Sequence, residues 1–270
     1  MRLHTLNKSS SDKKPNIKNL KERILSIFKK IIYGNPSIFF TFKPLKIYEF
    51  KELIKDIKFS KQDIVLDIGC GQGLSTLLIG KKCKKIYGID ISKKGLIIAE
   101  RRAKSLRKKV NSVFRQVKLE NAKFKEGFFD KIVSICVLEH ILNYKEVLIE
   151  IYRILKEGGP LLLSVDSLET IENTKFLEYH KKKCSVRRYF TKNDLMQILK
   201  EIGFKKILVY PIFKSEYSKK LYIRSIKDKN EKSNKLNHLN FIYRYLILKF
   251  AEALSLNKNK GIYLIAKCYK

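Results

Sequence analysis

The sequence of 270 residues lacks the residue patterns of several common protein classes. It has five cysteines without any CxxC spacing and only four histidines, which form no cluster. Cysteines without paired spacing exclude a disulfide scaffold and are typical of reduced thiols inside a cell. Because no Cys/His set has the spacing of zinc ligands, we expect no metal site.

Long hydrophobic runs are also missing. A membrane-spanning helix needs about 18 or more consecutive apolar residues, whereas the best uncharged run, Ile31 to Phe42, is shorter and contains Gly34, Asn35 and Pro36. The basic N-terminus has no apolar stretch that ends in a small-residue cleavage site, which a signal peptide requires. We therefore expect a cytoplasmic protein, either soluble or bound peripherally to the inner face of the membrane.

Acidic residues are few, with 26 Asp and Glu against 59 Lys and Arg, and the formal net charge is +33. Lysine dominates this excess and Asn and Ile are abundant too, a composition that A/T-rich codons produce without any anionic partner. Net charge alone leaves nucleic acid, an acidic lipid surface and an anionic substrate open as partners. The 44% of hydrophobic residues is ample for a core, which a disordered chain would lack.

Composition divides the chain into five segments. Residues 1–18 read as a disordered basic tail, 19–60 as an N-terminal helical lid or cap with a helix at about Leu45–Ile57, and 61–211 as the core. Residues 212–260 combine a polar loop, expected at Asp228–Asn237, with an amphipathic helix, and 261–270 form a final strand.

The core alternates short apolar runs with helical patterns. Thr191, with Asp194 three residues later, predicts the start of a helix that ends at Gly203. This alternation predicts an α/β fold with a doubly wound, mostly parallel seven-stranded sheet and helices on both faces. The expected strands are Ile64–Asp67, Lys85–Ile89, Ser112–Val117, Asp130–Ile135, Leu161–Val165, Lys206–Tyr210 and Ile262–Cys268.

Two amphipathic segments flank this core, Leu20–Ile32 and Phe241–Leu256. Both combine apolar side chains at helical spacing with Lys or Arg. Such a segment either packs on the domain, as a helix or a lid, or lies on a membrane surface. The sequence leaves both interpretations open.

The strongest motif is the run Val65-Leu-Asp-Ile-Gly-Cys-Gly-Gln-Gly73, placed where the first strand meets the first helix of the core. Glycines at Gly69, Gly71 and Gly73 let the backbone turn sharply and approach a ligand closely. The spacing is GxGxG instead of GxGxxG, and Asp67 precedes the first glycine by two residues. A carboxylate there suits a ligand with an ammonium or sulfonium group better than a pyrophosphate.

A second motif, Gly88-Ile-Asp-Ile-Ser92, places Asp90 at the end of the second strand. A carboxylate at this position can accept hydrogen bonds from both ribose hydroxyls of an adenosine. By itself Asp90 could equally cap a helix. Next to the glycine run, ribose binding is the better interpretation.

These motifs resemble those of the class I S-adenosylmethionine-dependent methyltransferases, in the type 11 branch that includes ubiquinone and menaquinone methyltransferases. The resemblance covers about residues 45–211 and the last strand. The matching blocks are VLDIGCGQG, GIDIS, Phe128–Ile141 with its FD and EH pairs, Arg153–Gly159, Arg188–Thr191 and Gly203-Phe204.

The resemblance implies S-adenosyl-L-methionine as the cofactor. The residues implied to surround it are Asp67, Gly69, Cys70, Gly71, Gly73, Asp90, Ile91, Leu119 and Cys136. Asp90 should bind the ribose, Ile91 should lie against the adenine, and the backbone amide of Leu119 should contact the adenine ring. The backbone of Cys136 should lie near the methionine part, and Gly73 should allow close helix packing.

Position 118 departs from the family pattern. The family often has an acid there that accepts the adenine amino group, whereas this chain has Lys118, which cannot accept a hydrogen bond. Glu120 would replace the acid if the loop shifted. This departure keeps a second interpretation open, a non-enzymatic or cofactor-impaired binding protein on the same fold.

The methyl acceptor is only partly constrained. His140 and His180 are candidate bases, with Tyr189 a further candidate. The chain has neither an N-P-P-Y-like run after the fourth strand nor a Pro-Cys pair, so two common types of nucleic-acid methyltransferase are disfavoured. We expect a small-molecule, saccharide or lipid-like acceptor, with a basic RNA methyltransferase as the alternative.

Overall fold

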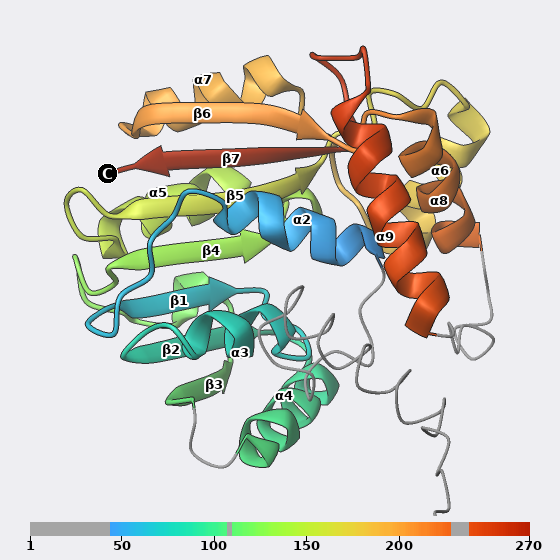
Figure 1. The fold of residues 1–270 in the computed structure, drawn as a ribbon. Coiled ribbons are helices and arrows are strands. Elements are labelled where there is room, and N and C mark those ends of the chain that lie inside the picture. The colour runs from blue at the N-terminus through green and yellow to red at the C-terminus, as the bar shows by residue number, and fades with distance from the viewer. Residues whose placement is uncertain (1–43, 107–109, 228–237) are drawn as a thin grey trace, which may run out of the picture. The chain divides into compact units, whose positions relative to one another are not determined.

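The apolar runs of the core form one seven-stranded sheet in the computed structural model, which describes residues 44–106, 110–227 and 238–270 (Figure 1). The strands are β1 (Ile64–Ile68), β2 (Lys85–Asp90), β3 (Ser112–Gln116), β4 (Lys131–Ile135), β5 (Pro160–Asp166), β6 (Lys205–Ile212) and β7 (Tyr263–Tyr269). Their order in the sheet is β3-β2-β1-β4-β5-β7-β6. The predicted doubly wound, mostly parallel α/β fold is confirmed.

β7 is the one strand of the sheet that is antiparallel to its neighbours. It lies between β5 and β6 and pairs antiparallel with both. All seven residues of β5 are buried, as expected for a strand covered on both faces. The chain order reverses beside β1, which has β2 on one side and β4 on the other. In open α/β sheets, ligands bind at such a switch point, outside the carboxyl ends of the strands.

Ten helical segments are present in the described residues. They are α2 (Pro44–Ile54), α3 (Leu74–Gly80), α4 (Lys93–Ser105), η2 (Leu119–Asn121), η3 (Leu138–His140), α5 (Tyr144–Ile154), α6 (Thr174–Cys184), α7 (Lys192–Ile202), α8 (Glu216–Lys227) and α9 (His238–Ala253). Thr191 caps α7 by accepting from the Asp194 amide, and Gly203 ends α7 in a left-handed conformation. These two helix boundaries were predicted from the sequence and are confirmed.

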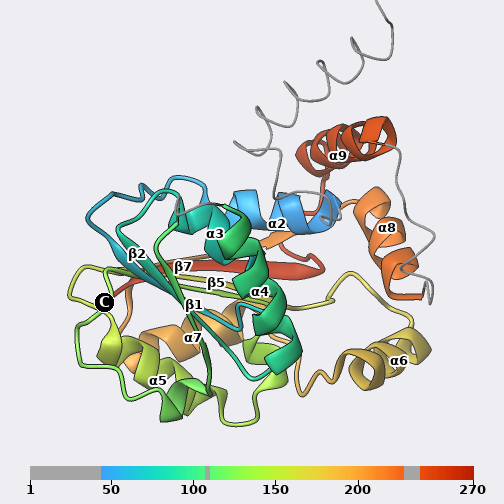
Figure 2. The same ribbon diagram turned by 90° about the horizontal axis from the view of Figure 1, so that it is seen from below.

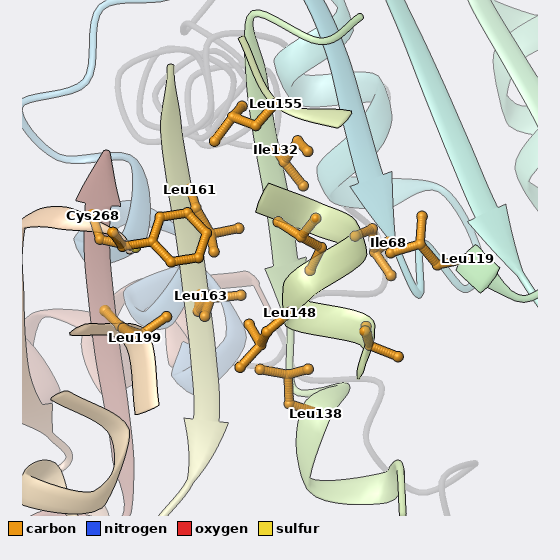
Figure 3. Close-up of a cluster of buried hydrophobic side chains, with 14 of the residues drawn as sticks. Ile68, Leu119, Ile132, Leu138, Leu148, Leu155, Leu161, Leu163, Leu199 and Cys268 are labelled. Carbon is orange, nitrogen blue, oxygen red and sulfur yellow. The ribbon is translucent and has the colours of Figure 1, made fainter. Parts of the chain in front are cut away.

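Helices cover both faces of the sheet, and each layer encloses its own core (Figure 2). The core below α5 and α7 contains Leu148 and Leu199 against Ile132, Leu161 and Leu163 (Figure 3). The core below α2 and α3 contains residues of the opposite strand faces. Its members include Leu45, Leu53, Val65, Ile79, Val133, Leu162 and Ile265.

Three helices lie outside this two-layer arrangement. α6 and α8 lie beyond the carboxyl end of β5, and α9 packs against α2 and α8 (Figure 1). The expected insertion between the sixth and seventh strands therefore holds α8 and α9, and α6 and α8 had no clear signal in the sequence. The predictions for residues 1–18, Leu20–Ile32 and Asp228–Asn237 concern positions outside the described residues.

No helix among the described residues combines the length and apolar character needed to cross a membrane.

Candidate active site at the carboxyl ends of the central strands

The glycine run forms the turn from β1 to α3. Gly69, Gly71 and Gly73 all have positive φ, at 67°, 49° and 74°, a region that residues with a Cβ rarely adopt. A Cβ at Gly73 would lie 2.6 Å from the Cβ of Ala99 in α4, so Gly73 lets the loop and α4 pack closely. Apart from its two chain neighbours, no described residue has an atom within 4 Å of a Cβ built at Gly71, so a ligand could approach the backbone there.

The loop is held in place by hydrogen bonds to β2. The amides of Gly69 and Cys70 donate to the Ile89 carbonyl at 2.8 and 3.0 Å. Asp90 accepts from the Gly71 amide through Oδ2 and from the Ser92 amide through Oδ1, both at 2.7 Å. A carboxylate has about four acceptor positions, so Asp90 keeps room for ribose hydroxyls while it fixes the loop. Its neighbour Ile91 is 68% exposed.

Asp67 lies below the loop and is almost fully buried. Its Oδ2 accepts from Ser75 Oγ at 2.9 Å and from Thr76 Oγ1 at 2.6 Å, which fixes the first turn of α3. Burial raises the pKa of Asp67 to about 6, although the two hydroxyl groups oppose this rise. Asp67 therefore has a structural role in the loop, and its contact with a ligand stays a prediction.

Cys136, directly after β4, belongs to a polar cluster with α2. Its φ of 52° is unusual for a residue with a side chain, and such strain is frequent at functional sites. The Cys136 thiol donates to Glu49 Oε1 at 2.9 Å, and Ser164 Oγ donates to the same oxygen at 2.6 Å. The Lys46 ammonium lies 2.9 Å from Glu49 Oε2 and 3.3 Å from Cys136 Sγ.

Two further acids are buried beside this cluster. Glu139 in η3 is fully buried, and neither of its carboxylate oxygens has a hydrogen-bond partner in the described part of the chain. Burial, and then the charge of Asp166, raise the pKa of Glu139. Burial also raises the pKa of Asp166 to about 7, against the opposing charge of Lys46. The two carboxyl groups are thus readily protonated, which lowers the cost of burying them.

The Cys136 sulfur and the Glu139 and Asp166 carboxylates offer three atoms within 4.8 Å of one another. This grouping is small enough to surround a cation. However, the Lys46 ammonium already lies against Cys136 Sγ and would repel a metal ion. We therefore assign no metal to this site.

His180 in α6 has both ring nitrogens occupied. Tyr189 OH donates to the Leu177 carbonyl at 3.2 Å, so it accepts at 3.0 Å from Nδ1–H of His180. Tyr222 OH then donates to Nε2 at 2.7 Å. Burial lowers the pKa of His180 to about 4, which agrees with this neutral tautomer, assigned from the hydrogen bonds. Asp166 Oδ2 lies 3.7 Å from Nε2.

His140 differs from His180 because it is exposed at the end of η3. Its Nδ1 lies 3.3 Å from the Ser185 carbonyl. The two predicted candidate bases thus lie in different environments, His180 buried and hydrogen-bonded and His140 exposed.

The methyltransferase domain family matches residues 66–163 of the chain, which include the glycine loop, Asp90 and Cys136. A ubiquinone biosynthesis O-methyltransferase of Dechloromonas aromatica is 34% identical over 101 residues, which are 37% of this chain and 43% of that protein. A demethylmenaquinone methyltransferase of Alkalihalophilus pseudofirmus is 25% identical over 216 residues, 70% of this chain and 91% of that protein.

The chain belongs to the class I S-adenosylmethionine-dependent methyltransferases. Its motifs place it in the type 11 branch, as the sequence predicted. A SAM-dependent methyltransferase of Thermotoga maritima has the same fold, with a TM-score of 0.56 at 17% identity over 94% of this chain and 96% of that one. The chain spans less than half of the length of the Dechloromonas relative.

The loop of this methyltransferase suits its family's cofactor on three structural grounds. Gly71 faces open space, the Asp90 carboxylate has acceptor capacity left, and Ile91 exposes an apolar surface beside it. Gly69 and Cys70 contribute through backbone geometry, since their amides already bond to β2.

Lys118 and Leu119, expected beside the adenine, lie after β3 at the start of η2. Lys118 is exposed and immediately precedes η2, whereas the Leu119 side chain is buried in the core and Glu120 is exposed. The structure therefore offers no buried acid at position 118.

The sequence analysis did not single out four residues that contact Cys136 or His180, namely Lys46, Glu49, Asp166 and Tyr222. Asp166 could have been predicted from the sequence, because it ends a strand of the parallel sheet, where functional side chains gather. Lys46, Glu49 and Tyr222 had no such signal, because they come from helices before and after the family's central blocks.

Proposed function

We propose that this methyltransferase transfers the methyl group of S-adenosylmethionine to a small-molecule, saccharide or lipid-like acceptor. The observation that carries this proposal is the pairing of Asp90 with the open Gly71 backbone, 2.7 Å from amide to carboxylate. The names of the two relatives concern ubiquinone and menaquinone. They favour, among these acceptors, a quinone precursor with a hydroxyl or ring carbon as nucleophile.

S-adenosylmethionine, when bound, supplies a methyl group already activated on a sulfonium. The protein must therefore align the acceptor and receive its proton, since in-line geometry supplies much of the rate. We assign the ribose to Asp90, the adenine to Ile91 and the Leu119 amide, and the methionine end to the loop and the Cys136 backbone. Asp67 supports that loop from below.

For a hydroxyl acceptor we propose that Tyr222 and His180 receive the proton. The acceptor O–H gives its proton to the Tyr222 oxygen while the Tyr222 proton moves to His180 Nε2, 2.7 Å away. The resulting imidazolium lies 3.7 Å from Asp166 Oδ2 and lowers the pKa of that carboxyl group, so the ionised form of Asp166 is favoured and stabilises the imidazolium. His140 is the alternative base, because it is exposed near the same strand ends.

The base assignment is tested by Tyr222→Phe, which removes the proton path and leaves the ring. We expect kcat to fall by about 100-fold with KM nearly unchanged, the range of general-base catalysis. His140→Gln is the matched variant and should keep its activity. The reverse result, with loss only in His140→Gln, would move the role of base to His140.

The function is tested by calorimetric titration with S-adenosylmethionine, followed by transfer of a radiolabelled methyl group to fractions of a cell extract. We expect binding, and label in an organic-soluble fraction. A folded chain that binds no cofactor would instead be the binding protein that Lys118 favours. Label recovered in RNA, with salt-dependent RNA binding, would support the basic RNA methyltransferase.

We also infer that the methyltransferase works inside the cell at a membrane surface, where a lipid-like acceptor would be found.

A further inference from the structure

The outer face of α9, continued by Leu254 directly after the helix, carries an apolar stripe. Tyr243, Leu246, Phe250 and Leu254 follow at intervals of three or four residues and are 65%, 52%, 67% and 63% exposed. Residues at this spacing share one face of a helix. Single exposed apolar side chains are ordinary, but four in a row on one face mark an interaction surface.

This stripe is not the face by which α9 packs on the protein. Tyr245 and Leu248 are buried on the opposite side, toward α2 and α8. Glu252, also on the inner side, accepts from the amides of Lys214 and Ser215 at 2.9 and 3.0 Å and from the Ser218 hydroxyl at 2.8 Å. The inner face thus anchors α9 and holds the stripe outward.

The charges around the stripe have one sign. At about 100° per residue, Lys249 lies on one flank of the stripe and Arg244 on the other. Lys258 and Lys260 follow the helix and are exposed. Among residues 241–260 the single acid is Glu252, which is buried and bonded inward. The outward charge of this described segment is therefore entirely positive.

We propose that α9 binds the surface of an anionic lipid bilayer, with its axis in the plane of the membrane. The stripe enters the boundary of the acyl chains, while Arg244 and Lys249 extend sideways to lipid phosphates. An apolar stripe between two basic flanks matches this layered surface, whereas a protein partner of the same shape would need its own anionic rim.

The orientation would bring the acceptor side of the site toward the membrane. α9 contacts α2, which carries Lys46 and Glu49, and α8, which carries Tyr222 (Figures 1 and 2). The usefulness of this arrangement rests on the proposed lipid-like acceptor. Membrane binding itself needs neither cofactor nor acceptor, so it is measured independently of methyl transfer.

The test is sedimentation of the full chain with vesicles of phosphatidylcholine, alone or mixed with phosphatidylglycerol, at low and high salt. We expect binding to the anionic vesicles at low salt, weakened by added salt. Leu246→Ser and Phe250→Ser should each lower the partition coefficient about 10-fold, because each removes one inserted apolar side chain. Lys249→Glu should reduce the preference for anionic lipid by about 10-fold.

The matched control is Ile149→Ser, the same kind of change at a residue 57% exposed on α5. It should leave vesicle binding unchanged, and circular dichroism should show every variant folded. No binding of the full chain to anionic vesicles at low salt overturns the proposal. So does an equal loss in Ile149→Ser. A dimer in analytical ultracentrifugation that Leu246→Ser dissociates, without vesicle binding, would assign the stripe to a second copy of the chain.

Discussion

The two sides of the strand ends are built in different ways. The proposed cofactor side, at β1 and β2, is held together by backbone amides and carbonyls from residues 67–92, and the Asp90 carboxylate accepts from two of these amides. The proposed acceptor side, at β4 and β5, is made of side chains from α2, η3, α6 and α8, with Lys46 and Tyr222 far apart in the sequence. The first is a local motif and the second is a product of the whole fold.

The two sides also differ in how they bury charge. The carboxylate of Asp90 is only partly buried and accepts from two amides. Glu139 and Asp166 are buried with few partners, and their pKa values rise as a result. A preformed backbone loop suits a ligand common to a whole family, whereas buried acids and tyrosines can be changed one at a time to suit a particular acceptor.

The largest effect should separate two glycines of the same loop. Gly73→Ala places a methyl group 2.6 Å from Ala99 Cβ at a positive φ, and we expect a loss of about 3 kcal/mol in the free energy of unfolding. Gly71→Ala adds a methyl group facing open space and should cost about 1 kcal/mol, but it should weaken cofactor binding. Urea denaturation and calorimetry measure both. Equal destabilisation would contradict the distinction.

The next largest effect should come from Asp90, the side chain to which we assign the ribose. Asp90→Ala should raise the Kd for S-adenosylmethionine on the order of 10-fold or more, because charge-assisted hydrogen bonds to the ribose are lost. Titration calorimetry checks the affinity, and circular dichroism checks that the variant is folded. Unchanged affinity in a folded variant would refute the ribose contact.

On the proposed acceptor side, Asp166→Asn tests whether ionisation of the buried acid lowers the free energy of unfolding. Burial raises the pKa of Asp166 to about 7, so the native state binds more protons than the unfolded chain between about pH 4 and 7. Ionisation therefore costs stability as the pH rises through this range. The variant should gain stability relative to the native chain as the pH rises, by at most about 4 kcal/mol at alkaline pH for a pKa raised by about three, and this gain should vanish near pH 4. A difference independent of pH would disprove it.

The smallest effect should come from the adenine side. Lys118→Asp restores an acceptor for the adenine amino group and should tighten cofactor binding. The range for one such hydrogen bond is about 1–2 kcal/mol, and the exposed position of Lys118 favours the lower end. Calorimetry measures the change, with Lys123→Asp, also exposed after η2, as the control for net charge. Weaker binding would show that Lys118 itself makes a useful contact.

The sequence by itself determined the positions of the strands, the turn at the glycine loop and the place of Asp90 at the end of β2. Strand periodicity, the Thr191 cap and the Gly203 stop are local signals, and glycine spacing reports backbone conformation directly. The bounds of β1 to β6 follow the predicted runs within about two residues, a usual margin for such boundaries. The partial match of α9 to the predicted amphipathic segment has the same origin, since helical spacing is local.

Only the tertiary structure decided which side chains meet at the acceptor side and which face of α9 stays outside. Glu49, Cys136 and Ser164 share one hydrogen-bonded group although 115 residues separate the first from the last. In the sequence, Tyr245 and Leu246 belong to one apolar pattern, yet one is buried and the other exposed. The physical reason is that long-range packing selects the buried face and the partners of each polar group, and neither choice is encoded in the spacing of neighbouring residues.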